Sequence, residues 1–253
     1  MTLRREGLEV HSTGVSVRGV SEPTGVTREA PWRAGLRAVR ANVLPGLIVQ
    51  GAMVVLLVLY YFYPPAQGVF LRLAKTKEAW GFGYSILAAA IAGAVVPELL
   101  RVLINQRGRV LVKNLRELLF TVPFWGGMGF IVDVFYRCQA QWFGDEPVPS
   151  VVIPQVLVDQ FLYNPLYAAP VTVWLFDWKN RGYRMTRDFF TVRYYRDHVV
   201  PALFATWGVW IPVVTVLYLL PEPVQIPLFS LALSLWAILY AWMSEDQARR
   251  AAA

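Results

Sequence analysis

The sequence predicts an all-α protein, a multi-pass bundle of about six transmembrane helices. Three observations support this fold class. The 253 residues are 56% hydrophobic and only 16% charged, whereas a soluble domain carries roughly 25% charged residues. The mean hydropathy is +0.43. The apolar residues also gather in runs of about 18 or more, which is the length of helix that crosses a bilayer.

Composition also argues against several other classes of protein. The formal net charge is +7, but the basic residues lie between the apolar runs, so loop charge explains them better than nucleic-acid binding does. The single cysteine, Cys138, excludes an intramolecular disulfide and a cysteine cluster for a metal. The two histidines, His11 and His198, are too few for a histidine-based metal site. We therefore expect no metal, no cofactor and no nucleic-acid partner.

The first segment, 1–41, is a polar leader. We expect a disordered tail that ends in a short basic helix over 32–40. No apolar core follows within the first 30 residues, so the leader does not fit a secretory signal, and its four Glu argue against a mitochondrial presequence. The transmembrane domain is expected to cover 42–244, and a short tail covers 245–253.

The apolar segments follow in order, each bounded by charges or by helix-breaking residues. The first ends before Pro64-Pro65, because proline cannot continue a helix. In the second, Ala89 and Gly93 form a pair of small residues that allows close helix contact. The expected spans cover 45–63, 80–103, 118–136, 151–178, 199–220 and 227–243.

The distribution of Lys and Arg predicts the orientation in the membrane. From the leader onward, the segments outside the spans hold 7, 3, 5, 1, 6, 0 and 2 basic residues. High counts alternate with low ones, which predicts both termini on the cytoplasmic side, or on the matrix side in an organelle. The exception is the first external loop, where Arg72, Lys75 and Lys77 exceed the expected charge. The Arg-rich composition favours a bacterial cytoplasmic membrane over an organelle membrane.

The fourth segment, 151–178, carries polar residues that a simple anchor does not need. Asp159 and Gln160 are adjacent, and Asn164 and Pro165 follow. An acid near the centre of a lipid span costs about 2.5 to 3.5 kcal/mol, so Asp159 must face protein, water or a partner. Two interpretations stay open. Asp159 lines an aqueous path, or it bonds to a neighbouring span and fixes the packing of the helices.

A second acid, Asp133, lies near the outer end of the third segment, at a height similar to that of Asp159. Two acids at one height could attract cations as part of a ring or share a proton. A pair between Asp133 and Arg137 is the structural alternative.

The prolines of the fourth segment predict free backbone carbonyls. Pro165 and Pro170 have no amide donor, which releases the carbonyls of Phe161 and Leu166, four residues upstream of each. Such carbonyls either form an ion or substrate site or mark a kink that neighbouring helices tolerate.

The long inner loop, 177–198, mixes arginines with aromatic residues. This composition is typical of an interfacial helix, with aromatics in the headgroup layer and Arg on the phosphates. An ordinary inside loop is the alternative. The lipid-headgroup candidates are Arg184, Arg187, Arg193 and Arg196. We expect anionic membrane lipids as partners and leave a homo-oligomer open.

Three motifs occur together in the order known from one membrane-protein family. The first, GFIVDVFY, keeps Gly129, Phe135 and Tyr136 of a Gly-Pro-x-x-His-x-aromatic-Tyr pattern; the second is Asp159-Gln160 followed by Pro165. The third is a C-terminal block of Trp and Pro residues, namely Trp207, Trp210, Pro212, Pro221 and Trp236. Over 80–244 the chain thus resembles the peroxisomal membrane protein family of twenty-two kilodaltons, which includes Mpv-seventeen.

The resemblance implies a small membrane protein with four to five spans in the shared part, a low-selectivity pore for small solutes, and no enzyme activity. The chain departs from the family at Phe130, at Asp133 and at Val214, where the family has Pro, His and Gln. We also see no nucleophile with a base and no Gly-rich phosphate loop, so we expect no enzyme. The alternative function is a non-conducting scaffold or lipid-organising protein. The pore candidates are Asp159, Gln160, Asn164, Pro165, Asp133 and Tyr136.

Overall fold

The computed structural model describes Leu36, Arg40 and residues 43–252; it describes the side chains of these residues except Asn105 and 239–252. Apart from Leu36 and Arg40, the predicted tail over 1–41 therefore lies outside the described residues. The described part is built from helices and contains no strand, which confirms the all-α fold class.

The chain begins with two helices, α2 (Val43–Phe62) and α3 (Pro64–Trp80). The next helical segment runs without a break through α4 (Phe82–Ala90), the π-helix η1 (Ile91–Val95), α5 (Val96–Leu100) and the π-helix η2 (Arg101–Asn105). A long helix follows, α6 (Val112–Phe143).

The second half of the chain starts with α7 (Pro149–Val158), which continues through the π-helix η3 (Asp159–Ala168) into α8 (Ala169–Asn180). After a loop and the short 3₁₀ helix η4 (Arg187–Phe190), the last helices are α9 (Val192–Tyr194), the π-helix η5 (Tyr195–Val199), α10 (Val200–Tyr218) and α11 (Glu222–Ala252). Helix α11 continues without a break to Ala252, so residues 245–252 of the predicted tail belong to this helix.

Four helical segments are long and apolar enough to cross a membrane: Val43–Phe62, Phe82–Ile104, Val112–Phe143 and Val192–Tyr218. The apolar part of α11, Glu222–Ile238, is shorter. The segment over 149–180 is long enough, but its polar residues dilute its apolar character. These helices fit an integral membrane protein, and the count of six spans stays a prediction.

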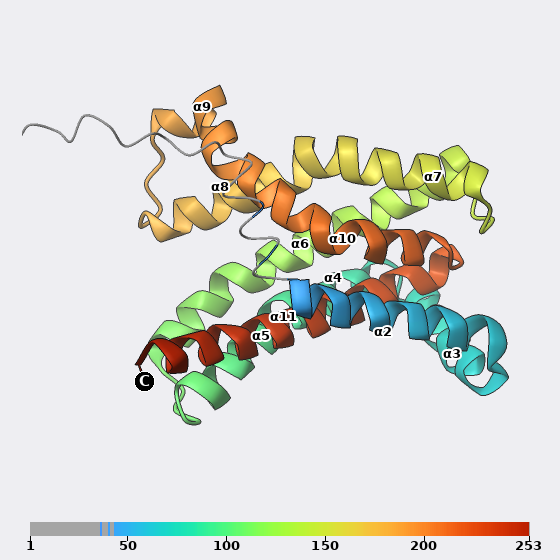
Figure 1. Ribbon diagram of the computed structural model, residues 1–253, viewed down its shortest axis with the longest axis horizontal. Coiled ribbons are helices and arrows are strands. Elements are labelled where there is room, and N and C mark those ends of the chain that lie inside the picture. Colours follow the sequence, from blue (N-terminus) through green and yellow to red (C-terminus); the bar gives the residue numbers. More distant parts are fainter. Residues whose placement is uncertain (1–35, 37–39, 41–42, 253) are drawn as a thin grey trace, which may run out of the picture.

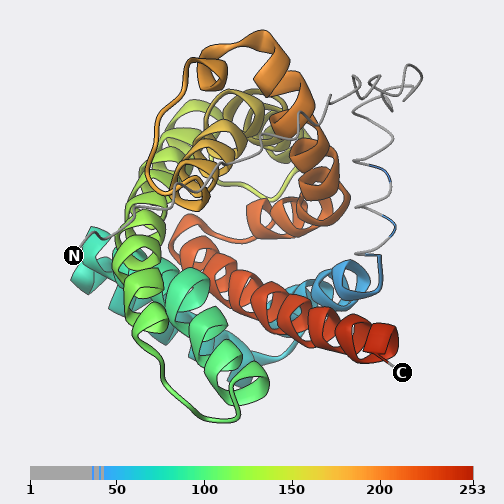
Figure 2. The same cartoon turned by 90° about the vertical axis from the view of Figure 1, so that its left-hand side faces the viewer.

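The helices form two groups that α6 connects (Figure 1). One group contains α7, α8 and α10, and the other contains α2, α3, α4, α5 and α11; α6 runs diagonally from one to the other (Figure 1). A view from the side shows α11 passing between α2 and α6 (Figure 2). The largest core cluster joins α2, α3, α10 and α11 around Met53, Leu217 and Leu228.

Close contact between α4 and α6 depends on small residues. A Cβ atom on Gly129 would overlap the Cβ of Ala89 and the carbonyl oxygen of Ser85. A Cβ atom on Gly93 would overlap the ring of Trp125. The predicted small-residue contact at Ala89 and Gly93 is therefore confirmed: Gly129 leaves room for Ala89 of α4, and Gly93 of η1 leaves room for the Trp125 ring of α6.

The segment predicted as the first external loop forms the helix α3. Pro64 does end α2, but it also begins α3, where proline at the first turn loses no hydrogen bond. The helix packs against α2 and α11 and buries Phe70, Ala74 and Lys77. Lys77, one of the three basic residues that exceed the charge expected of an external loop, is thus buried inside the protein.

The inner loop does not form the interfacial helix predicted over 177–198. Residues 181–186 are not helical, and the loop is fixed by polar contacts at the end of α8. Asp177 binds Arg181 and accepts a hydrogen bond from the hydroxyl of Tyr194 at 2.7 Å. Hydrogen bonds from Thr186 and Arg181 lower the pKa of Asp188 in the same loop.

Candidate functional site

A cavity of about 590 Å³ lies between the two groups of helices. One face of α10 lines it with residues spaced by four, which are Ala202, Thr206, Trp210 and Val214. At 1.5 Å per residue this face extends for about 18 Å. The same cavity is lined by α6, by α11, by the segment over 82–105 and by the segment over 149–180.

The two ends of the cavity differ in chemistry. Polar side chains from α6 and η3 gather at one end, which we call the polar end: Tyr136, Asp159, Gln160, Tyr163 and Asn164. Arg101 marks the other end, which we call the Arg101 end: Glu98 pairs with Arg101 and binds Asn114 near the start of α6, whereas Tyr136 lies near the end of that helix. Between the ends the walls are mostly apolar and aromatic. Four of the six predicted pore residues thus border one cavity: Tyr136, Asp159, Gln160 and Asn164.

Asp159 is buried, with 6% of its surface exposed, and both carboxylate oxygens accept hydrogen bonds. The amide of Gln160 donates to Oδ1 and the hydroxyl of Tyr218 donates to Oδ2, each at 2.7 Å. Within the described part of the chain, no cationic side chain pairs with Asp159. Asp159 thus borders the cavity and also bonds to a neighbouring helix, so both interpretations of this residue stay open.

A chain of hydrogen bonds extends from Asp159 away from the cavity. The amide of Gln139 donates to the Tyr218 hydroxyl at 3.4 Å and to the carbonyl of Gln155 at 2.9 Å. The amide of Gln155 donates to the carbonyl of Gly144 at 2.8 Å. These bonds join α6, α7, η3 and α10, so buried side chains that bind one another lie behind the polar end.

Pro165 in η3 and Pro170 at the start of α8 free two carbonyls, but each carbonyl lies one residue before the predicted position. A π-helix bonds each amide to the carbonyl five residues back rather than four. Pro165 therefore leaves the carbonyl of Gln160 without a partner, and Pro170 leaves that of Pro165. The indole N–H of Trp207 donates to the first at 2.8 Å, and the hydroxyl of Tyr195 donates to the second at 2.8 Å.

The identity of these donors decides between the two interpretations of the free carbonyls. Trp207 and Tyr195 belong to the segment that contains η5 and α10, a neighbour of η3. The carbonyls are thus satisfied by a neighbouring helix, as in a tolerated kink. The prediction that named Phe161 and Leu166 was wrong because it assumed an α-helix.

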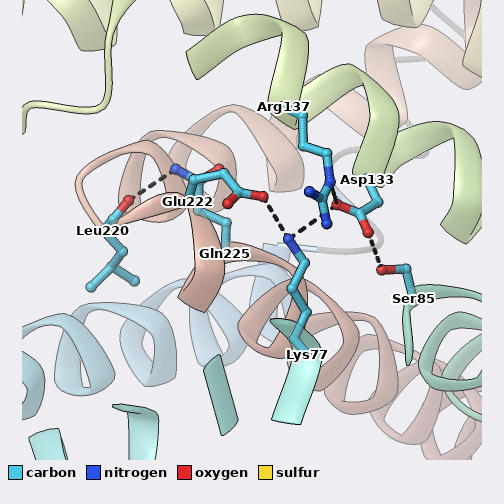
Figure 3. A network of polar contacts seen from close by, with 7 residues as sticks. All are labelled: Lys77, Ser85, Asp133, Arg137, Leu220, Glu222 and Gln225. Atoms are coloured by element: carbon cyan, nitrogen blue, oxygen red, sulfur yellow. Dashed lines mark hydrogen bonds and ion pairs between the residues drawn. The ribbon is translucent and has the colours of Figure 1, made fainter. Parts of the chain in front are cut away.

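Asp133 does not line the cavity but belongs to a separate buried network (Figure 3). The Lys77 ammonium lies 3.1 Å from Asp133 Oδ1 and 2.5 Å from Glu222 Oε1. Arg137 Nε lies 3.0 Å from Asp133 Oδ1, and the Ser85 hydroxyl donates to Oδ2 at 2.5 Å. Two cations balance two acids, and together they tie α3, α4 and α6 to the start of α11.

The network confirms the predicted pair of Asp133 with Arg137 and adds Lys77, which sequence reasoning placed in a loop. The available signal was the excess of basic charge before the second span. No hydrogen bond of the described residues joins Asp133 to Asp159, and each carboxylate bonds to different side chains. The two acids therefore do not form a shared site in this structure.

The opposite end of the cavity contains a balanced charge. Arg101 lines the cavity there, and its guanidinium lies 2.8 Å from Glu98 Oε2. Glu98 also accepts a hydrogen bond from the amide of Asn114. The charge at the Arg101 end is thus neutralised within the protein.

The remaining motif residues pack around the cavity. Phe135 stacks on Tyr163 with ring centroids 4.2 Å apart, and Trp210 contacts Phe229 at 5.6 Å. Val214 and Trp236 line the cavity. The other proline and glycine motif residues lie in helix α6 or α10 or at the turn between α10 and α11: Gly129, Pro212 and Pro221.

Comparisons with protein-family models, with curated proteins and with solved structures found no match to this chain. The resemblance to the peroxisomal membrane protein family therefore stays a hypothesis that rests on the three motifs.

Proposed function

We propose that this protein is a membrane-embedded path for small solutes, closed at the polar end in the conformation described here. The predicted topology assigns the polar end to the outer half of the membrane and the Arg101 end to the cytoplasmic side. The cavity would then be reached from the cytoplasm. The bonds of Asp159, Tyr218 and Gln139 would have to rearrange before a solute could leave on the other side.

The observation that carries this proposal is the position of Asp159 at the cavity wall without a cationic partner. Burial of a carboxylate costs several kcal/mol, and hydrogen bonds to a charged group return about 1.5 to 3 kcal/mol each. The Lys77 network shows that this chain neutralises a buried acid where its role is packing. An acid left without such a partner beside a cavity fits a site that water or a solute cation occupies.

Conductance and solute release test the proposal. The purified protein is reconstituted into planar bilayers and into liposomes loaded with a small fluorescent dye. We expect conductance steps that favour K⁺ over Cl⁻, and a reversal potential in a KCl gradient that moves towards zero in Asp159→Asn. Folded protein that gives neither conductance nor dye release would contradict the proposal.

A non-conducting lipid-organising protein is the second candidate, and the loop after α8 favours it. Arg184 and Arg187 are exposed and have no ion pair among the described residues, whereas Arg193 and Arg196 pair with Asp197. Met185 and Phe190 are also exposed in this loop. Arginine near an anionic surface contributes about 1 kcal/mol per residue.

Liposome binding tests this candidate. A double variant, Arg184→Glu with Arg187→Glu, should weaken the preference for vesicles with anionic lipid over neutral vesicles. Arg193→Glu is the control, because Asp197 already pairs with it. Equal lipid preference in the double variant and the wild type would count against a headgroup role for the loop.

A further inference from the structure

We infer that the cavity binds organic monocations, with the ammonium group at Asp159 and an apolar body along the aromatic walls. The inference rests on the proposed function, because it names the class of solute that the path would carry. Binding can be measured without transport, so an experiment can contradict the binding of cations and the transport path independently.

The charge of the cavity wall selects the sign of the ligand. Asp159 and Arg101 are the charged residues of the lining, and Glu98 neutralises Arg101. Lys77 and Arg137 lie in the separate network and do not line the cavity. One negative charge is thus left at the polar end, and a monocation balances it.

The carboxylate of Asp159 has room for a further donor. An ionised carboxylate offers about four lone-pair sites. Gln160 and Tyr218 occupy one on each oxygen, at 2.7 Å.

Tyr163 provides an independent sign of a binding site. It lines the cavity beside Asp159, and its hydroxyl group is buried without a hydrogen-bond partner among the described residues. Buried hydroxyl groups in native proteins nearly always have a partner. A ligand with an N–H donor, or a water molecule that travels with it, would supply this partner.

The walls suit the apolar body of such a ligand. Six aromatic residues line the same cavity: Trp125, Tyr136, Tyr163, Trp210, Phe229 and Trp236. Aromatic faces attract ammonium groups, and Trp does so best. The cavity volume of about 590 Å³ lies within the range of about 300 to 1,000 Å³ that is typical of small-molecule sites.

Calorimetric titration of the full chain in nanodiscs of neutral lipid tests the inference. The probes are benzylammonium, which carries N–H donors, and benzenesulfonate, which has a similar size and the opposite charge. We expect the cation to bind at least about tenfold more tightly than the anion, a difference of about 1.4 kcal/mol. Asp159→Asn should weaken cation binding by a similar factor. Asp145→Asn, which removes an acid from the exposed loop after α6, should leave it unchanged.

Two results would overturn the inference: equal binding of the two probes, or wild-type cation binding in a folded Asp159→Asn variant. If Asp159→Asn does not fold, Trp210→Leu decides, with the exposed Trp142→Leu as its control. Loss of the preference for the cation in Trp210→Leu alone supports the site, and no change overturns it. Cation binding without any flux would contradict only the proposed path, whereas flux without cation binding would contradict only this inference.

Discussion

The indole N–H of Trp207 donates to the carbonyl oxygen of Gln160 at 2.8 Å. Pro165 has no amide hydrogen, so the π-helix η3 cannot satisfy this carbonyl itself. Trp207 supplies the missing bond from α10 and fixes η3 where its polar residues meet the cavity. The same residue pair connects two of the three sequence motifs, Asp-Gln-Pro and the C-terminal Trp block.

Removing this donor should destabilise the fold. Trp207→Phe keeps an aromatic ring but leaves the Gln160 carbonyl unpaired, which costs about 1 to 3 kcal/mol. We expect a lower Tm in detergent, followed by circular dichroism. Trp142→Phe is the matched control, because Trp142 is exposed on α6. Equal melting temperatures for Trp207→Phe and the wild type would show that the bond contributes nothing to stability.

Lys77 should be essential to the packing of α3, although the sequence alone predicted a charged loop at this position. Lys77→Met keeps the length of the side chain but leaves Glu222 unpaired and Asp133 with one cation fewer. Removal of one partner from a buried ion pair costs about 3 to 5 kcal/mol. A large fall in Tm or in the yield of folded protein is the expected result.

The exposed neighbour Lys75 provides the control for this change. Lys75→Met should melt at nearly the wild-type temperature, since exposed charges contribute about 0 to 1 kcal/mol. If both lysine variants lose the same stability, the loss comes from charge removal in general rather than from the buried network.

Two glycines on α6 allow a test of helix packing. A Cβ atom on Gly129 would overlap Ala89 and the backbone of Ser85, whereas one on Gly127 would meet nothing within 4 Å. Gly129→Ala should therefore destabilise the protein by about 1 to 3 kcal/mol, the usual cost of overpacking. Gly127→Ala should be neutral or stabilising, because alanine is the better helix former. The reverse order of stability would contradict the close contact of α4 and α6.

Much of the architecture could be predicted because long apolar runs and helix-breaking prolines are local signals. The close contact at Ala89 and Gly93 followed in the same way from small residues on one helix face. The π-helix η3 could not be predicted, because the shift from four to five residues per bond depends on tertiary contacts such as that of Trp207. The second partner of Asp133, Lys77, was missed for a similar reason, since only the fold brings this lysine close to α6.

The candidate site shows the same division between local and tertiary signals. The adjacent Asp159 and Gln160 identified the polar end, and both residues border the cavity. Asp133 is also an acid in an apolar segment, but its contacts place it in the charge-balanced ion-pair network with Lys77 and Arg137. Whether a side chain faces the cavity depends on its direction and on the residues around it. The residue type and its predicted height in the membrane do not determine either of these.

The two acids should therefore respond differently to the same substitution. Asp133→Asn leaves Lys77 and Arg137 without a shared acid, so it should lower the free energy of unfolding by about 3 to 5 kcal/mol, the cost of a broken buried pair, and lower Tm accordingly. Ion preference per folded molecule should not change, because Asp133 does not line the cavity.

Asp159→Asn keeps an acceptor for Tyr218 and should alter Tm less, but it should reduce the preference for K⁺ over Cl⁻. Both properties are measured on the same reconstituted samples, by circular dichroism and by the reversal potential. A change in ion preference in Asp133→Asn equal to that in Asp159→Asn would mean that the two acids act on one path.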